Sequence, residues 1–252
     1  MKKRVSGFII GLFLIAGLTQ SGYAASWIFD TTADGDQSDA LAIIEWIDIT
    51  STNLVLGNAD PAVAGSFSFN NSGTVSAVKV DNSTTEIDEL FKIWQLGAYY
   101  SFTGTGDTQE GSIAFDPGGT LTLTVGSVDV ATLTVISGSG SIDSEAVSNG
   151  DITISYSLEV LAENYLFWED GTAMTNAIAY TTTNANRITN ETLKTALLEK
   201  QGVTQDQADS YDIVFYLSSN GQFRLEPVPV PTAFLLLGSG LIGLVGFRRK
   251  IG

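Results

Sequence analysis

The sequence predicts an all-β protein, a single antiparallel sandwich or jelly-roll-like domain with one or two short helices. Three observations support this prediction. Short runs of residues alternate between apolar and polar side chains, as strands with one buried face do. Turn-forming residues separate these runs at short and fairly regular intervals, which is typical of sandwiches. Residues 25–226 hold 20 of the 25 aromatic residues, which makes disorder a poor alternative to a folded domain despite the high charge.

The expected strands follow from the alternation, taken in chain order. They are Trp27–Asp30, Ser66–Phe69, Thr74–Val80, Ser112–Phe115, Leu121–Val125, Ala131–Ile136, Asp151–Leu161, Tyr211–Leu217 and Gln222–Leu225. Three turns are predicted between neighbouring strands of this series, at Asn70–Gly73, Asp116–Gly119 and Ser219–Gly221.

Two segments indicate helices. Asn190 to Lys200 places apolar residues at helical spacing, with Asn190 as the N-cap and Gly202 as the stop. Ser83–Glu86 forms a capping-box sequence before residues 87–94, where we favour a helix over a strand. Thr204 and Gln207 have the spacing of a further capping box and predict one more turn.

Charge is distributed very unevenly along the chain. The whole sequence has 28 acids and 12 bases, but residues 25–226 hold all 28 acids against six bases, a net charge of −22. Such a field repels nucleic acid, so we expect no polynucleotide partner. The absence of His and Cys excludes Ser-His and Cys-His catalysis, thiolate or imidazole metal sites and disulfides.

The first 24 residues have the pattern of a secretory signal peptide. A basic start is followed by an apolar run from Val5 to Leu18 and by small residues before the expected cleavage between Ala24 and Ala25. A retained membrane anchor is the alternative. Signal peptidase is therefore an expected partner, and residues 25–226 are expected to form the exported acidic domain.

Residues 227–252 form a three-part tail. Val228-Pro229-Val230-Pro231 precedes an apolar stretch from Thr232 to Phe247, and Arg248, Arg249 and Lys250 follow. Sixteen residues in a helix span about 24 Å, a minimal transmembrane length. Basic residues at both ends of the chain are expected to stay on the cytoplasmic side, which leaves residues 25–226 outside.

This tail resembles the PEP-CTERM sorting signal of bacteria with an outer membrane, in its Val-Pro-x-Pro variant. The resemblance implies that Pro229 and Pro231 are recognised and that an exosortase-like membrane protease removes the tail; a permanent single-span anchor is the alternative. Several segments, among them Trp27–Asp30 and the aromatic Asn164–Trp168, also resemble PEP-CTERM proteins associated with flocculation.

Acidic residues suggest one candidate metal site. Asp34, Asp36 and Asp39 lie in a dense run of oxygen ligands, and Glu45 is twelfth from Asp34, as in a Ca²⁺-binding loop. Asp39, however, stands where such a loop needs glycine, so a solvated acidic turn is the preferred interpretation. We expect no other cofactor.

A carbohydrate site is the other candidate. Tyr165 and Trp168 could stack on a sugar, and Glu159, Glu163, Glu169 and Asp170 lie near them in sequence as possible glycosidase carboxylates. We favour a non-enzymatic protein of the cell surface or extracellular matrix, held in exopolysaccharide, biofilm or flocs. A secreted carbohydrate-binding or carboxylate-based carbohydrate-active module is the alternative.

Overall fold

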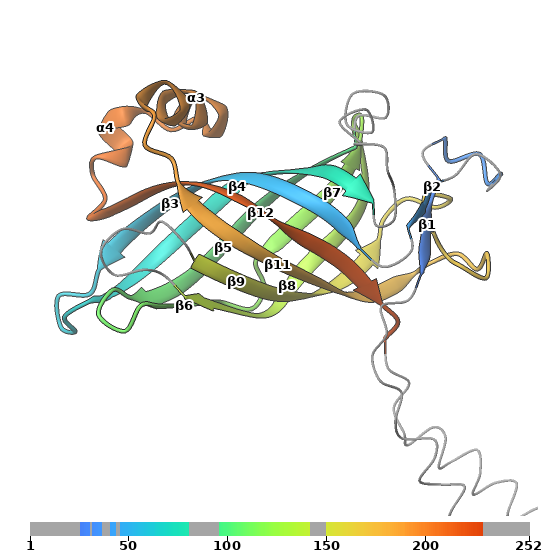
Figure 1. Ribbon diagram of the computed structural model, residues 1–252, viewed down its shortest axis with the longest axis horizontal. Helices are drawn as coiled ribbons and strands as arrows, with labels where there is room; N and C mark the ends of the chain where they lie inside the picture. Colours follow the sequence, from blue (N-terminus) through green and yellow to red (C-terminus); the bar gives the residue numbers. More distant parts are fainter. Residues whose placement is uncertain are drawn as a thin grey trace, which may run out of the picture.

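The protein folds into a closed antiparallel β-barrel (Figure 1). The computed structural model describes residues 26–30, 32–36, 41–43, 46–80, 96–141 and 150–228. The barrel strands are β3 (Ile47–Ala59), β4 (Ser66–Val80), β5 (Leu96–Asp107), β6 (Ser112–Phe115), β7 (Thr120–Val125), β8 (Val128–Ser141), β9 (Gly150–Val160), β11 (Asn176–Arg187) and β12 (Ile213–Glu226). Strands β6 and β7 share one position, because both pair with β5 on one side and with β8 on the other. The ring therefore has eight positions.

The all-β prediction is confirmed, but the sandwich is replaced by a barrel. Strand β12 pairs with β11 and with β3, so the last barrel strand closes the ring on the first. Alternation of apolar and polar residues is the same in a sandwich and in a barrel. What distinguishes them here is a pairing between segments far apart in sequence, which no local pattern reveals.

Two of the predicted turns are wrong. Asn70–Gly73 lies inside β4 and Ser219–Gly221 lies inside β12, and both strands run through without a break. The glycines are needed for close packing: a Cβ on Gly73 would lie 2.5 Å from the Tyr100 hydroxyl, and one on Gly221 would lie 2.6 Å from the Cα of Thr183. The third turn, Asp116–Gly119, is present, but it interrupts the wall between β6 and β7 instead of reversing the chain.

The predicted helix at 190–200 is confirmed as α3 (Glu191–Gln201), with Asn190 as N-cap and Gly202 in the left-handed conformation at its end. Thr204 and Gln207 form the predicted capping box of α4 (Gln205–Ala208). The helix expected within residues 83–94 lies outside the described residues. Sequence patterns missed three long strands, β3, β5 and β11.

Side chains fill the barrel interior. Phe69 and Phe115 meet edge to face with ring centroids 5.5 Å apart, and Tyr100 stacks on Phe102 at 4.7 Å. Two of the internal spaces between the described side chains have volumes of about 30 and 50 Å³, room for water molecules only. The interior is thus a packed core.

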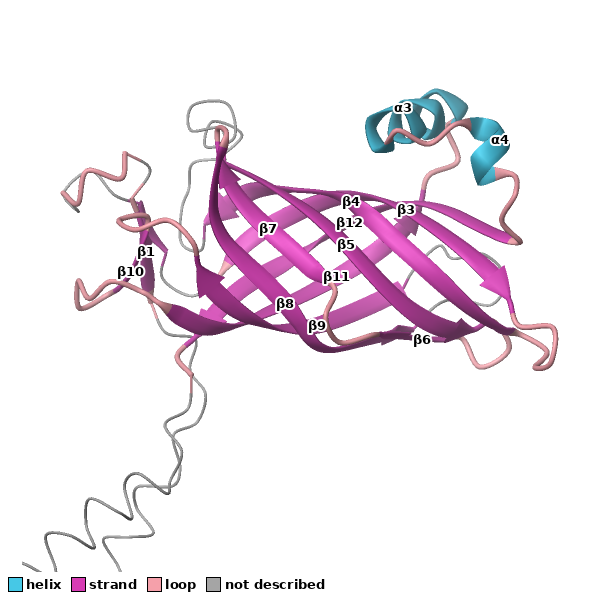
Figure 2. Cartoon of the chain, turned by 180° about the vertical axis from the view of Figure 1, so that it is seen from behind, coloured by secondary structure: helices cyan, strands magenta, loops and turns pink. Residues whose placement is uncertain are grey.

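A small three-stranded sheet lies at one end of the barrel, formed by β1 (Trp27–Phe29), β2 (Leu41–Ile43) and β10 (Leu166–Trp168) (Figures 1 and 2). Its Trp27 ring meets the inward-facing Phe223 edge to face at 6.3 Å. The described chain begins and ends at this end, because Ser26 accepts a hydrogen bond from Glu169 and Glu226 is the last residue of β12. The helices α3 and α4 lie toward the other end.

Candidate functional site

The outer face of β3 and β12 changes from apolar to polar along the barrel. Under the helices this face carries Leu54 and its partner Tyr216, which belong to a cluster with Leu197, Leu198 and Ala208. Beyond the helices, the outward-facing register pairs are polar. They are Thr52 with Ser218, Thr50 with Asn220, and Asp48 with Gln222. The apolar pairs pack against the helices, and the rows of polar pairs are exposed to solvent.

These polar rows form a groove that we call the wall groove. Its first part has a volume of about 440 Å³ and is lined by Thr50, Ser51, Thr52, Thr74, Asn186, Lys200, Ser218, Ser219 and Asn220. Its second part has a volume of about 510 Å³ and is lined by Asp48, Ile49, Thr50, Thr182, Asn184, Asn220, Gly221 and Gln222. Thr50 and Asn220 line both parts, so the two hollows join. Each volume is in the usual range of small-ligand pockets.

Behind the wall groove, on the inner side of the barrel wall, buried hydrogen bonds join β3 and β12. The hydroxyls of Ser51 and Ser219 bond to each other, and the Asn53 side chain donates from Nδ2 to Ser219 Oγ at 2.8 Å. Ser51 and Ser219 are paired in the strand register, and both have small side chains. Ser51 and Ser219 alternate with the outward-facing residues of their strands, so their side chains point into the barrel and join β3 to β12 on its inner side.

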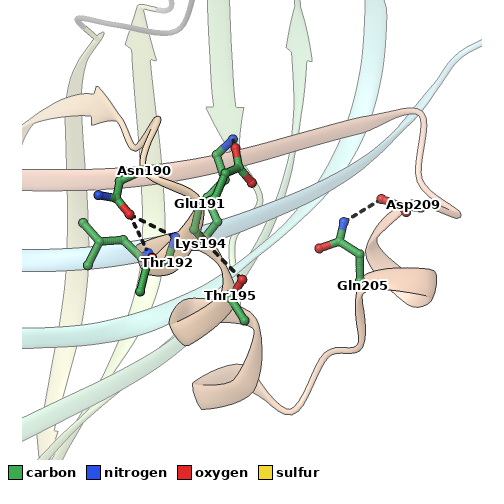
Figure 3. A network of polar contacts seen from close by, with 8 residues as sticks. Asn190, Glu191, Thr192, Lys194, Thr195, Gln205 and Asp209 are labelled. Atoms are coloured by element: carbon green, nitrogen blue, oxygen red, sulfur yellow. Dashed lines mark hydrogen bonds and ion pairs between the residues drawn. The ribbon is translucent and has the colours of Figure 1, made fainter.

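Lys200 reaches the groove from the last turn of α3. Its ammonium donates to Thr74 Oγ1 on β4 at 2.9 Å, so the side chain extends from the helix to the barrel wall. The start of the helix is fixed by Asn190, whose side chain accepts hydrogen bonds from the backbone N–H groups of Thr192 at 2.9 Å and Leu193 at 3.2 Å (Figure 3). Glu191 and Lys194 form an ion pair of 2.7 Å on the same helix. The helix thus holds Lys200 beside the groove.

The predicted sugar contacts lie elsewhere. Trp168 and Tyr165 are half-buried and pack against the core, with the Tyr165 ring 6.4 Å from that of Phe29. They contribute to the small sheet and its flank, and they do not form an exposed stacking surface.

The predicted carboxylates are exposed and scattered. Glu159 points outward from β9, where its register partners are Asn176 and Thr132. Glu163, Glu169 and Asp170 lie in exposed positions on either side of β10. The hydroxyl and backbone N–H of Thr172 donate to Asp170 and lower the pKa of this carboxyl. None of these acids lines the wall groove.

The acidic loop after β1 is organised by a residue that the sequence did not single out. Asp30 is fully buried, and its carboxylate accepts hydrogen bonds from the N–H groups of Thr32, Ala33 and Gly35 and from the Thr32 hydroxyl. Asp34 accepts from the Asp36 N–H at 2.8 Å. Asp39 and Glu45 lie outside the residues whose side chains are described, so the Ca²⁺ prediction stays a prediction. Among the side chains that are described, no three acids converge on a common point.

The wall groove was missed because its residues carry no sequence motif. Thr, Ser and Asn on the outer face of a strand are ordinary solvent-facing residues, and only the pairing of β12 with β3 and the position of α3 bring them together. The available signal was the polar run Thr181–Asn186, which places no apolar residue on the outer face of β11.

The predicted processing signals fall at the ends of the chain. The signal peptide, Ala24 and Ala25 lie outside the described residues, as do Pro229, Val230, Pro231, the helix expected at 232–247 and the basic residues Arg248, Arg249 and Lys250. Val228 is described and is exposed. Neither of the two helices in the described part of the chain is long and apolar enough to cross a membrane.

Comparison with known proteins identifies the tail. Residues 227–250 match the model of the PEP-CTERM protein-sorting motif. No curated protein and no solved structure matches the chain. The PEP-CTERM motif indicates export and processing by an exosortase, with delivery to the cell surface or beyond. The chain is therefore an exported protein that carries a PEP-CTERM sorting signal.

Proposed function

We propose that the protein is a non-enzymatic component of the cell surface or of the exopolysaccharide matrix. The observation that carries this proposal is the sorting motif at residues 227–250, joined to an acidic barrel whose interior is packed with side chains. Because side chains fill the interior, other molecules can contact the barrel only at its outer wall. That wall carries hydroxyl, amide and carboxylate groups, which can hydrogen-bond with the hydroxyl groups of polysaccharide.

The arrangement of acids supports a role without catalysis. A glycosidase needs two carboxyl groups on either side of one bond, roughly 5 to 10 Å apart. Here Glu159 lies on the outer wall, and Glu163, Glu169 and Asp170 lie in exposed positions beside β10. Exposed carboxylates of this kind are suited to many weak contacts.

Divalent cations provide a second way of joining this protein to a matrix. Ca²⁺ takes six to eight oxygen ligands and tolerates irregular geometry, so it can bridge carboxylates of different molecules. With 28 acids and six bases, residues 25–226 supply many such ligands. We therefore propose Ca²⁺ as a bridging ion between copies of the protein and acidic polymer.

The test is aggregation of matrix polymer or of cells lacking the protein. Protein recovered from the surface of expressing cells is added in Ca²⁺ or in chelator, and turbidity and sedimentation are measured. We expect aggregation that depends on the protein and is stronger in Ca²⁺. Aggregation that is the same with and without the protein contradicts the proposal.

The enzyme alternative has its own readout in the same samples. Release of reducing sugar is measured for the wild-type protein and for Glu159→Gln, Glu163→Gln and Glu169→Gln. We expect no release above background in any of them. Sugar release that is abolished by one of these substitutions favours the hydrolase.

A further inference from the structure

We propose that the wall groove is a binding site for a carboxylated polysaccharide, with one sugar carboxylate held at Lys200. The inference rests on the proposed function and adds to it a place on the barrel and a class of polymer. Four features of the groove support it: its charge, its polar lining, the order of its residues, and its position relative to the chain ends.

The charge of the groove differs from that of the rest of the exported segment. Acids outnumber bases 28 to six in residues 25–226, yet no acid lines the first part of the groove and Lys200 does. Within the described part of the chain, the Lys200 ammonium has no carboxylate within ion-pair distance, and its hydrogen bond goes to the hydroxyl of Thr74. An ammonium has three N–H donors, so two remain for a ligand. A carboxylate is the partner that makes the strongest hydrogen bonds with them.

The lining fits the rest of a sugar unit. Apart from Lys200, the first part of the groove is lined only by hydroxyl and side-chain amide residues. Hydroxyls and amides both donate and accept hydrogen bonds, as sugar hydroxyls do.

The order of residues along the groove indicates which units follow one another. Lys200 lines the first part, and Asp48 lines the second. A second sugar carboxylate next to Asp48 would be repelled, whereas a neutral unit can donate its hydroxyls to Asp48 and Gln222. The groove therefore favours a polymer in which a carboxylated unit is followed by a neutral one.

The position of the groove suits a polymer outside the cell. Lys200 is on α3, toward the end of the barrel away from the chain ends (Figure 1). The sorting signal follows Glu226 at the opposite end. Along β12, the Lys200 part of the groove is the part farther from Glu226.

The experiment measures binding of surface-recovered protein to four soluble polymers of similar length in chelator, which removes bridging by divalent cations. They are hyaluronate, in which carboxylated and neutral units alternate, polygalacturonate, neutral dextran and poly-glutamate. We expect the order hyaluronate, polygalacturonate, dextran, with poly-glutamate no better than dextran. Lys200→Gln should weaken hyaluronate binding about tenfold at low salt, since an exposed charge-assisted hydrogen bond is lost.

The matched control is Lys194→Gln, which removes the same charge from the same helix at a residue that contacts Glu191 and the Tyr216 ring instead of the groove. It should change the affinity less than twofold. Asn220→Asp is nearly isosteric, and it places a carboxylate where the two parts of the groove meet. It should also weaken hyaluronate binding, and thermal unfolding should show that all three variants remain folded.

The outcomes separate the two proposals. If Lys200→Gln and Lys194→Gln bind hyaluronate equally well, or if dextran binds as tightly as hyaluronate, the groove assignment is overturned. Tight binding of poly-glutamate would overturn the sugar part of the assignment, because charge alone would then suffice. If wild-type protein aggregates matrix polymer but Lys200→Gln binds hyaluronate as tightly as wild type does, the matrix function stands and the groove assignment is overturned. If wild-type protein does not aggregate matrix polymer, the proposed matrix function is itself contradicted.

Discussion

The barrel depends on aromatic rings that lie over glycines of the next strand, and one such pair allows a quantitative test. Phe67 on β4 is the register partner of Gly106 on β5. A Cβ added to Gly106 would overlap the end of the Phe67 ring, lie 2.6 Å from its Cε1 and lie 3.1 Å from Ile113 Cγ2. All of these obstructing atoms belong to side chains.

We expect Gly106→Ala to destabilise the barrel by about 1–2 kcal/mol. Overpacking costs about 1–3 kcal/mol, and the lower entropy of the unfolded alanine chain offsets about 0.5–1 kcal/mol of this. For a domain of this size each kcal/mol corresponds to roughly 2–4 °C, so the melting temperature should fall by about 4 °C. Urea denaturation and thermal unfolding measure the two quantities.

The cause is isolated by a double-mutant cycle with Phe67→Leu, which removes Cε1 and Cζ. In that background Gly106→Ala should be neutral or slightly stabilising, which gives a coupling energy of about 2 kcal/mol. Gly104 opposite Phe69 is the control, because a Cβ there would also overlap the backbone oxygen of Ala114. Gly104→Ala should therefore stay destabilising even with Phe69→Leu. Equal costs of Gly106→Ala with and without the Phe67 ring would refute this explanation.

Three further predictions concern pH and processing. Burial raises the pKa of Tyr100 and of Tyr156 above the value of about 10 for an exposed tyrosine. Because both hydroxyls stay neutral in the folded barrel, the barrel keeps its stability below pH ~10 and loses it as the pH rises further. Tyrosinate absorbance from these two residues should therefore appear only as the barrel unfolds. Tyr156→Phe should unfold at a higher pH than the wild-type protein. Mass spectrometry of the surface form should find no peptide from 235–252; an intact tail would favour a permanent anchor. N-terminal sequencing should begin at Ala25, and a start at Met1 would contradict signal cleavage.

Local features of the fold were predictable because local interactions create them. Asn190 and Gly202 define the ends of α3 by hydrogen bonds within a few residues of the chain. Ser112–Phe115 alternates clearly and forms β6 with the predicted bounds. In these cases the sequence pattern and the structure depend on the same neighbours.

One of the missed strands, β11, has polar or very small residues on its inner face. Strand β11 points Ala177, Ala179, Thr181 and Ala185 inward, and all four are buried. The aromatic rings of other strands, such as Tyr156 beside Thr181, fill the space that these small residues leave. A small residue opposite a large one packs well, but the sequence of such a strand does not alternate between apolar and polar residues.

The wall groove could not be predicted for a related reason. Its lining comes from β3, β4, β11, β12 and α3, which are distant in sequence, and each lining residue is unremarkable in its own strand. The sorting signal, by contrast, is contiguous, and it was recognised from its own residues.

The pairing of β12 with both β3 and β11 also sets the order of events during synthesis. A chain is made from its N-terminus, and β12 is the last strand of the ring. Until residues 213–226 are available, β3 and β11 each have an edge without a partner, and unpaired edges can pair with other chains. The next residues to be made are those of the sorting motif, which begins at residue 227. The last strand of the barrel and the sorting signal are therefore synthesised one directly after the other. A chain truncated before residue 213 would have unpaired edges on β3 and β11 and would lack the sorting signal.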